Sequence, residues 1–224
     1  MKIAFHTLGC KVNQYETEGL KENFKKAGHE VVPDTEFADA YVINTCTVTN
    51  LADRKSRQFI RRARAINPDA AIAVTGCYVQ VAPEEVAAIE GVDIIAGTNE
   101  KSAMVSLVEE YIKDGSKIRQ VKSYEELDTY EEIGTITSME SRTRAYIKIQ
   151  EGCDRFCSYC IIPFARGSVR SRRPSEILKE AESLVRAGFK ELILTGINAA
   201  LVRSRDLYAI LMTLISRICM ASKS

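Results

Sequence analysis

Short apolar runs alternate with amphipathic segments through the first half of this 224-residue chain. The runs end at glycine or a turn residue, which is typical of buried strands, and the segments between them carry apolar residues at helical spacing. Apolar strands that alternate with helices indicate a parallel sheet covered by helices on both faces. We therefore predict the α/β fold class, with strands over 2–8, 40–45, 71–75 and 92–96 and helices over 14–27, 50–66, from Pro83 onward and over about 99–112.

The pattern changes after residue 112. Residues 113–142 are polar and rich in charge, so we expect a linker that contains a strand or two. Beyond it the alternation resumes and predicts two βα repeats. The predicted organisation is an α/β domain over 1–112, a linker over 113–142 and a second unit over 143–224, with strands over 144–150 and 190–195 and helices over 174–187 and 206–218.

The charge balance and the start of the chain exclude several classes of protein. The 31 Lys and Arg residues against 30 Asp and Glu residues leave a net charge of +1, so we expect no overall attraction to DNA or to a membrane surface. No apolar run approaches the roughly 20 residues that span a bilayer, and the chain enters a strand-like run without a signal peptide. We therefore expect a cytoplasmic protein, in which seven cysteines form no disulfide framework.

Three of these cysteines lie on one predicted loop directly after the strand 144–150. Cys153, Cys157 and Cys160 have the spacing C-x3-C-x2-C, and their soft sulfur ligands favour zinc or iron–sulfur. A structural zinc site usually needs a fourth Cys or His, and none follows nearby. Three local ligands suit a 4Fe–4S cluster with one iron open to a small molecule; a zinc site or plain structural thiols remain the alternative.

Three more cysteines follow three different predicted strands. Cys10, Cys46 and Cys77 come after the strands 2–8, 40–45 and 71–75, and parallel strands have their carboxyl ends on one edge of a sheet, where such folds bind ligands. Gly9 and Gly76 precede two of them and allow close backbone approach. The sequence therefore predicts a second metal centre, against the alternative that these are buried cysteines acting as small apolar residues.

The residues around both triads resemble the radical S-adenosylmethionine (SAM) methylthiotransferases. The resemblance runs from residue 1 to about 198 and is carried by HTLGCKVNQYE (6–16), VINTCTVT (42–49), TGCY (75–78), GTN (97–99) and the C-x3-C-x2-C loop. Within that family, GCKVNQYE together with ADRKSRQ (52–58) is most similar to the branch that acts on threonylcarbamoyladenosine in tRNA.

The resemblance implies a chemistry and a set of ligands. Two 4Fe–4S clusters would be held by the two triads, Tyr159 would lie beside the adenine of SAM, and Thr195-Gly196 would contact its amino group, although this stretch is not the common acidic form. The implied reaction replaces C2–H of the modified adenosine at tRNA position 37 by a methylthio group. SAM would serve as radical source and methyl donor, together with an electron donor and a sulfur donor.

No catalytic side chain is expected, because an aromatic C–H is too weakly acidic for any side-chain base and a cofactor radical must take the hydrogen. His6 and His29 are accordingly expected to be structural. Two alternatives stay open: a methylthiotransferase for isopentenyladenosine in tRNA or for a ribosomal protein, and a fragment that binds iron–sulfur or RNA without catalysis.

Two groups of arginines are candidates for tRNA contact. Arg54, Arg57, Arg61 and Arg64 recur at helical spacing on one face of the segment 50–66, and Arg166 and Arg170, with Arg172 and Arg173, follow the cysteine loop. A guanidinium stripe is a candidate phosphate-contacting surface. The alternative is a solvated helix face.

The second unit is expected to be incomplete. A TIM barrel needs roughly 250 residues, the resemblance implies about six βα units and a terminal RNA-binding β-barrel, and only two βα units are predicted here. The chain departs from the family after Asn198, and Cys219 lies in a tail without a counterpart. We expect a truncated barrel that is partly disordered or needs a partner.

Overall fold

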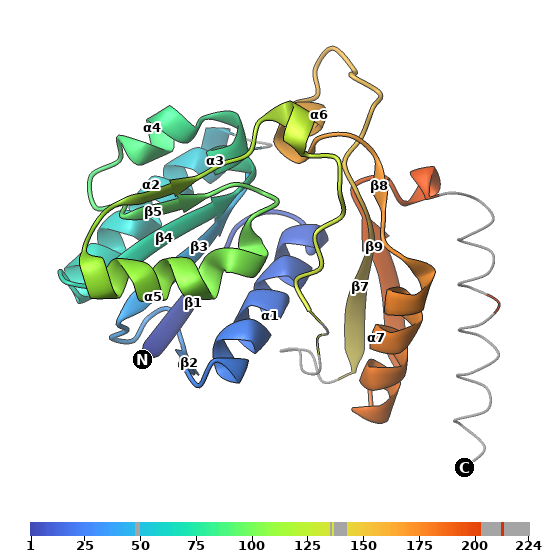
Figure 1. Cartoon of the computed structure of the whole chain (residues 1–224), viewed down its shortest axis with the longest axis horizontal. Coiled ribbons are helices and arrows are strands. Elements are labelled where there is room, and N and C mark those ends of the chain that lie inside the picture. Colours follow the sequence, from blue (N-terminus) through green and yellow to red (C-terminus); the bar gives the residue numbers. More distant parts are fainter. Residues whose placement is uncertain (48–49, 135, 137–142, 203–211, 213–224) are drawn as a thin grey trace.

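The computed structural model describes residues 1–47, 50–134, 136, 143–202 and 212. These form two α/β units that lie side by side (Figure 1). Among the described residues, no helix is both long and apolar enough to cross a membrane. The predicted helix 206–218, apart from residue 212, and Cys219 fall outside the described residues.

The first unit is built on a six-stranded parallel sheet with the strand order β2-β1-β3-β4-β5-β6. The predicted parallel α/β architecture is therefore confirmed. The chain moves outward in opposite directions from the junction of β1 and β3, and such a reversal places a crevice at the carboxyl ends of these strands. The strands are β1 Lys2–Thr7, β2 Glu30–Val32, β3 Ala40–Thr45, β4 Ala71–Gly76, β5 Ile94–Ala96 and β6 Ile118–Gln120.

Helices cover both faces of this sheet. The central strands β3 and β4 are therefore buried along their whole length. On one face Leu20 and Phe24 of the first helix pack with Met104 and Val108. On the other face Ile60 is among the residues that fill the core. The first face carries α1 Lys11–Lys26 and α5 Met104–Asp114, and the second carries α2 Asn50–Ile66, α3 Cys77–Val81 and α4 Pro83–Ala87.

The segment predicted as a linker is part of the structure of both units. Its strand β6 pairs with β5, so the first sheet extends beyond the predicted boundary at residue 112. Residues 121–134, here called the strap, then run between the units. The carbonyl of Leu127 accepts a hydrogen bond from Ser168 Oγ at 3.1 Å, and Tyr130 Oη donates to the carbonyl of Lys148 at 2.9 Å. The strap is thus fastened to the second unit along its length.

The second unit has a smaller sheet in the order β8-β7-β9, in which β7 and β9 are parallel and β8 is antiparallel. The two predicted βα repeats are only partly described, because the second helix lies outside the described range. Ile147 and Ile149 of β7 pack with Ile177 and Leu184 in its core. The elements are β7 Arg144–Glu151, α6 Ile162–Arg166, β8 Arg170–Ser171, α7 Pro174–Arg186 and β9 Glu191–Gly196.

Helix α1 lies between the two sheets and contacts both (Figure 1). It is therefore buried on nearly all sides, polar positions included. Tyr15 Oη donates to Glu180 Oε2 of α7 at 2.9 Å and accepts from Arg172 Nη1 at 3.1 Å. Because buried polar groups need partners, these contacts fix how the second unit sits on α1.

Candidate functional site

Three cysteines from the first unit lie at one edge of the sheet. Cys10 is the N-cap residue of α1, Cys46 directly follows β3, and Cys77 is the first residue of α3 after β4. The strands β1, β3 and β4 are neighbours, and Thr45 pairs with Gly76 in the register. The three residues therefore leave adjacent parallel strands at the same end, as the sequence predicted.

Gly9 lets the first two of these cysteines approach. A Cβ atom on Gly9 would lie 2.8 Å from the Cβ of Cys46 and 3.1 Å from its Sγ, so a side chain there would collide with Cys46. Cys10 is exposed, while Cys46 and Cys77 are buried. This edge of the sheet therefore has one thiol that solvent can reach and two thiols that are buried.

Three thiols at one edge of the sheet are a donor set that fits an iron–sulfur cluster. Within the part of the chain that the structure describes, no three His, Cys, Asp or Glu side chains converge closely enough to hold one metal ion. A 4Fe–4S cluster binds each thiolate to a different iron, so its ligands need not meet at one point. Soft sulfur donors on adjacent strand ends match that requirement.

Cys77 has a charged partner from the other unit. Arg166 Nε donates to its Sγ at 3.1 Å, and both side chains are buried. Burial raises the pKa of the Cys77 thiol, and the Arg166 guanidinium acts in the opposite direction. The guanidinium favours the thiolate, which is the form that binds metal.

The second triad lies on the loop that follows β7, which begins with Gly152 at φ +74°. A Cβ atom on Gly152 would lie 1.9 Å from the carbonyl oxygen of Ser168. Beside it, the N–H of Cys153 donates to the carbonyl of Gly167 at 3.0 Å. This close approach anchors the start of the loop. Cys153 and Cys160 are half-buried and Cys157 is exposed, which leaves the loop open to a small-molecule ligand.

Of the residues that the resemblance places near SAM, one lies on this loop and two lie at the end of β9. Tyr159 is 90% exposed. Thr195 and Gly196 end β9, where Gln150 links them to the loop, because its Oε1 accepts from the N–H of Asn198 at 2.7 Å. The Nε2 of Gln150 donates at 2.7 Å to the carbonyls of the two residues that follow it. One amide side chain therefore ties the end of β9 to the start of the cysteine loop.

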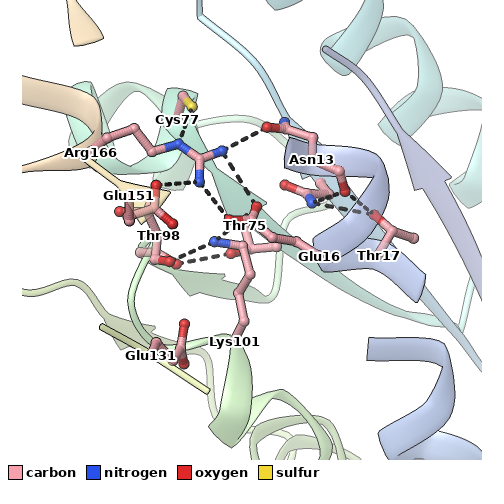
Figure 2. Close-up of polar contacts among 12 residues, drawn as sticks. Asn13, Glu16, Thr17, Thr75, Cys77, Thr98, Lys101, Glu131, Glu151 and Arg166 are labelled. Atoms are coloured by element: carbon pink, nitrogen blue, oxygen red, sulfur yellow. Dashed lines mark hydrogen bonds and ion pairs between the residues drawn. The ribbon is translucent and has the colours of Figure 1, made fainter. Parts of the chain in front are cut away.

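A buried group of charges lies beside Cys77 and the end of β7, and its pairings were not predicted from the sequence (Figure 2). Arg166 Nη1 contacts Glu16 Oε1 at 2.5 Å and Glu151 Oε1 at 3.0 Å. Lys148 Nζ contacts the same two carboxylates at 3.0 and 2.5 Å, and Lys101 Nζ lies 3.5 Å from Glu16 Oε2. We call these five residues the buried charge cluster; they come from α1, β7, α6 and the turn before α5.

The ion pairs determine the protonation states within the cluster. Burial alone would raise the pKa of Glu16, but Arg166, Lys101 and Lys148 hold it well below its ordinary value. Burial likewise opposes ionisation of Glu151, and Lys148 and Arg166 lower its pKa. Although burial acts against it, the two carboxylates raise the pKa of Lys148. Glu16, Glu151, Lys148 and Arg166 are therefore charged at neutral pH.

One signal in the sequence could have led to this cluster. Lys148 interrupts an apolar strand run, and Glu16 lies on a helix whose neighbouring positions are buried. A charged residue at a core-facing position requires a partner of opposite charge. The partners are more than a hundred residues apart in sequence, so the pairing itself was not visible.

Two arginines assigned to RNA contact require correction. Arg166 is fully buried and Arg170 is 5% exposed. The Nη2 of Arg170 donates to the carbonyl of Arg166 at 2.8 Å, and its Nη1 contacts the carbonyl of Leu127. Neither guanidinium faces solvent, so neither is part of an RNA-contacting surface in this structure. Arg172 is also buried, against Glu132 and Glu180.

The arginine face of α2 divides into two parts. Arg64 donates to the carbonyls of Pro68, Ala70 and Gly91 at 2.7, 2.6 and 3.1 Å, so it fastens the end of α2. Arg54 and Arg61 are exposed. Arg57 is partly exposed and contacts Tyr78 Oη at 3.2 Å and Glu85 Oε1 at 2.9 Å. A groove of about 620 Å³ runs beside Arg57, Arg61 and Arg64.

The two histidines make structural contacts. The ring of His6 stacks on Phe59 with 3.8 Å between the ring centroids, and its Nδ1 lies 2.6 Å from Asp34 Oδ2. His29 Nε2 lies 2.9 Å from Glu109 Oε1.

Comparison with known proteins connects this geometry to a family. Residues 2–97 match the "Uncharacterized protein family UPF0004", and residues 147–222 match the "Radical SAM superfamily". The chain is 53% identical over 196 residues to the threonylcarbamoyladenosine tRNA methylthiotransferase MtaB of Bacillus subtilis (strain 168), covering 88% of this chain and 43% of that protein.

Two further relatives are similar to this chain at lower sequence identity. The protein of the same name from Aquifex aeolicus (strain VF5) is 43% identical over 199 residues, covering 88% of this chain and 48% of that protein. The tRNA-2-methylthio-N(6)-dimethylallyladenosine synthase of Hydrogenobaculum sp. (strain Y04AAS1) is 36% identical over 204 residues, covering 88% and 46%. The chain spans less than half the length of each of these curated relatives.

Proposed function

Because this chain belongs to the radical SAM methylthiotransferase family, we propose that it supplies the two iron–sulfur sites of a cytoplasmic tRNA-modifying enzyme. The reaction proposed is replacement of C2–H of N6-threonylcarbamoyladenosine at position 37 by a methylthio group. The observation that carries this proposal is the presence of two cysteine triads, one on each unit, at ends of the units that Arg166 joins.

The two triads have separate roles in this proposal. Cys10, Cys46 and Cys77 hold the 4Fe–4S cluster that carries the sulfur to be transferred, and the C-x3-C-x2-C loop holds the other. When bound, the loop's cluster and SAM supply a carbon radical that removes a hydrogen atom from an aromatic C–H, which no side-chain base can deprotonate. The open position of the loop in the structure supports a site that admits SAM.

This chain's own residues orient SAM in the proposal. Tyr159 is free to lie against the adenine because 90% of its surface is exposed. Thr195 and Gly196 contact the amino group. Gln150 sets their distance from the loop, since its side chain hydrogen-bonds to both segments.

Phosphates of the tRNA would be held along α2. Arg57 contacts Tyr78, which directly follows Cys77, so the exposed arginine face begins beside the first triad and continues along the groove through Arg61. Arginine binds phosphate through two parallel hydrogen bonds, which suits a surface that positions RNA without reading its sequence.

The names of the relatives support the choice of base. The 53% identical relative is named as a threonylcarbamoyladenosine enzyme, and the relative named for dimethylallyladenosine is 36% identical. Methylthiolation of isopentenyladenosine is therefore the second candidate. An electron donor and a sulfur donor complete the set of proposed partners.

Anaerobic reconstitution with iron and sulfide tests the proposal. We expect about eight irons per chain, and about four after substitution of either triad by alanine. Addition of SAM and a reductant is expected to release 5′-deoxyadenosine from the wild-type chain but not from the Cys153→Ala variant. About four irons in the wild-type chain and no SAM cleavage would indicate a non-catalytic fragment. Mass analysis of nucleosides from tRNA treated with the protein distinguishes the two adenosine substrates.

A further inference from the structure

Among the described side chains, Arg166 alone contacts both Cys77 of the first triad and Glu151, which ends the strand before the second triad. Its Nε donates to Cys77 Sγ at 3.1 Å, its Nη2 donates to Asn13 Oδ1 at 2.6 Å, and its Nη1 contacts Glu16 and Glu151. Figure 2 shows the guanidinium at the centre of these contacts. Each of the three guanidinium nitrogens therefore has a partner.

The contacts of Arg166 leave it no alternative orientation. Its Nη atoms are held by two carboxylates, and those carboxylates are themselves fixed by Lys148 and Lys101. A planar guanidinium held at its Nη atoms has its Nε direction set by geometry. That direction leads to the Cys77 sulfur, which is the single contact of Nε among the described residues.

The charge balance of the region also points to the sulfur. The ion pairs join three cations, Arg166, Lys101 and Lys148, to two carboxylates, Glu16 and Glu151. Buried charge without compensation is strongly unfavourable. Arg170 is a further buried cation beside Arg166, and the carboxylates of Glu151, Asp128 and Glu131 act on it. The net positive charge of the five ion-paired groups is offset when the Cys77 sulfur is a thiolate bound in an anionic cluster.

We propose that Arg166 is a positioning residue for the cluster held by Cys10, Cys46 and Cys77. Arg166 belongs to the radical SAM unit and is held there by Glu151, so its bonds to Cys77 and Glu16 fix the Cys77 ligand to that unit, and its charge stabilises the reduced, more negative state of that cluster. This inference rests on the proposed function, because it requires that a cluster forms on the first triad. Reduction potentials of such clusters depend on net charge and on hydrogen bonds to their sulfur atoms.

The potential of the first cluster provides the test. We take the full chain with Cys153, Cys157 and Cys160 replaced by alanine, reconstitute it anaerobically, and follow reduction by electron paramagnetic resonance. In this background Arg166→Gln is expected to make the cluster about tenfold harder to reduce, a shift of about 59 mV to more negative potential for a one-electron couple. Arg166→Lys, which keeps the charge, is expected to recover part of the shift.

Glu151→Gln is the matched control. It also breaks buried ion pairs of the same cluster, those with Lys148 and Arg166, and it leaves the contact between Arg166 and Cys77 in place. It removes a negative charge, however, and is expected to move the potential in the opposite, more positive direction. Shifts of opposite sign with unchanged iron content support the proposal. Equal potentials in the parent chain and its Arg166→Gln variant, or shifts of the same sign in the Arg166→Gln and Glu151→Gln variants, overturn it.

Folding failure is separated from the inference by the lysine variant. If Arg166→Gln does not fold, a potential for Arg166→Lys identical to that of the parent, together with no shift in Glu151→Gln, overturns the proposal. If the parent background binds no cluster at all, the proposed function of the first triad fails and the inference fails with it. A parent cluster that forms but does not respond to Arg166 overturns the inference alone.

Discussion

Substitution of Glu16 by glutamine removes the central carboxylate of the buried charge cluster while keeping the side-chain volume. Glu16 is fully buried and contacts Arg166 at 2.5 Å, Lys148 at 3.0 Å and Lys101 at 3.5 Å. After the change, Lys148 and Arg166 share the single carboxylate of Glu151, and Lys101 loses its ion pair with Glu16. Breaking a buried pair by neutralising one partner costs about 3–5 kcal/mol. Because no cavity is formed, the loss reports the charge of the carboxylate and the hydrogen bonds that it accepts.

The assay is thermal or denaturant unfolding of the apo chain at neutral pH. At about 2–4 °C per kcal/mol for a chain of this size, the expected decrease in Tm is about 6–20 °C. Glu18→Gln, two residues along the same helix, is the control. Glu18 is 17% exposed and forms an i,i+3 pair with Lys21, which is worth about 0.2–0.5 kcal/mol. A Glu16→Gln protein within about 1 kcal/mol of wild type would refute the reasoning.

Three further predictions concern the same surfaces. Glu16 has a pKa in the folded state well below its unfolded value. Its contribution to the free energy of unfolding is therefore complete above about pH 4.5 and is lost as the pH falls through the folded pKa. The stability difference between wild type and Glu16→Gln should accordingly shrink on acidification. Gly152→Ala should lose about half of the reconstituted iron, because its Cβ would lie 1.9 Å from a carbonyl oxygen, whereas Gly188→Ala, also at positive φ but with nothing within 4 Å, should keep it. Arg57→Glu with Arg61→Glu should weaken tRNA binding, more so at low salt, lower the salt slope of log K by on the order of 1.5, and leave the iron content unchanged.

The controls for the last two are specific. Equal iron content in the two glycine variants would show that the loop does not depend on the close approach at Gly152. For tRNA, Arg186→Glu with Lys190→Glu changes the charge equally at exposed positions of the second unit. Equal loss of affinity in both double variants would indicate a general charge effect and contradict binding along α2.

Much of the first unit was predictable because its central strands are long and uniformly apolar. The strands β3 and β4 and the edge carrying the three cysteines follow directly from that pattern. The edge strands β2 and β6 have three residues each, too few to show a period, and β6 lies in a polar segment whose pairing with β5 is decided by tertiary contact. The start of α1 at Lys11 was expected three residues later because Lys11, Val12 and Asn13 carry no helical apolar spacing.

The candidate site was predictable in its ligands and not in their surroundings. Cysteines are rare enough for their spacing to carry information. A basic residue, by contrast, is predicted to be exposed unless an acidic partner for it is known. Arg166 and Arg170 were assigned to RNA for this reason. The carboxylates that bury Arg166 come from α1 and β7, and the carbonyl that holds Arg170 comes from the strap. Pairings over such sequence distances appear only in three dimensions.

The strap limits how the two units can move. It is hydrogen-bonded at Leu127 and Tyr130 to the second unit, and the carbonyl of Ile133 accepts from Asn23 of α1 at 2.8 Å. Rotation of one unit about a hinge would have to break these bonds and the buried ion pair between Arg166 and Glu16 together, which opposes domain rotation on the microsecond-to-millisecond timescale. The two cysteine triads are thereby held at a constant separation, so under the proposed function the substrate base has to reach both of them without a movement of the units.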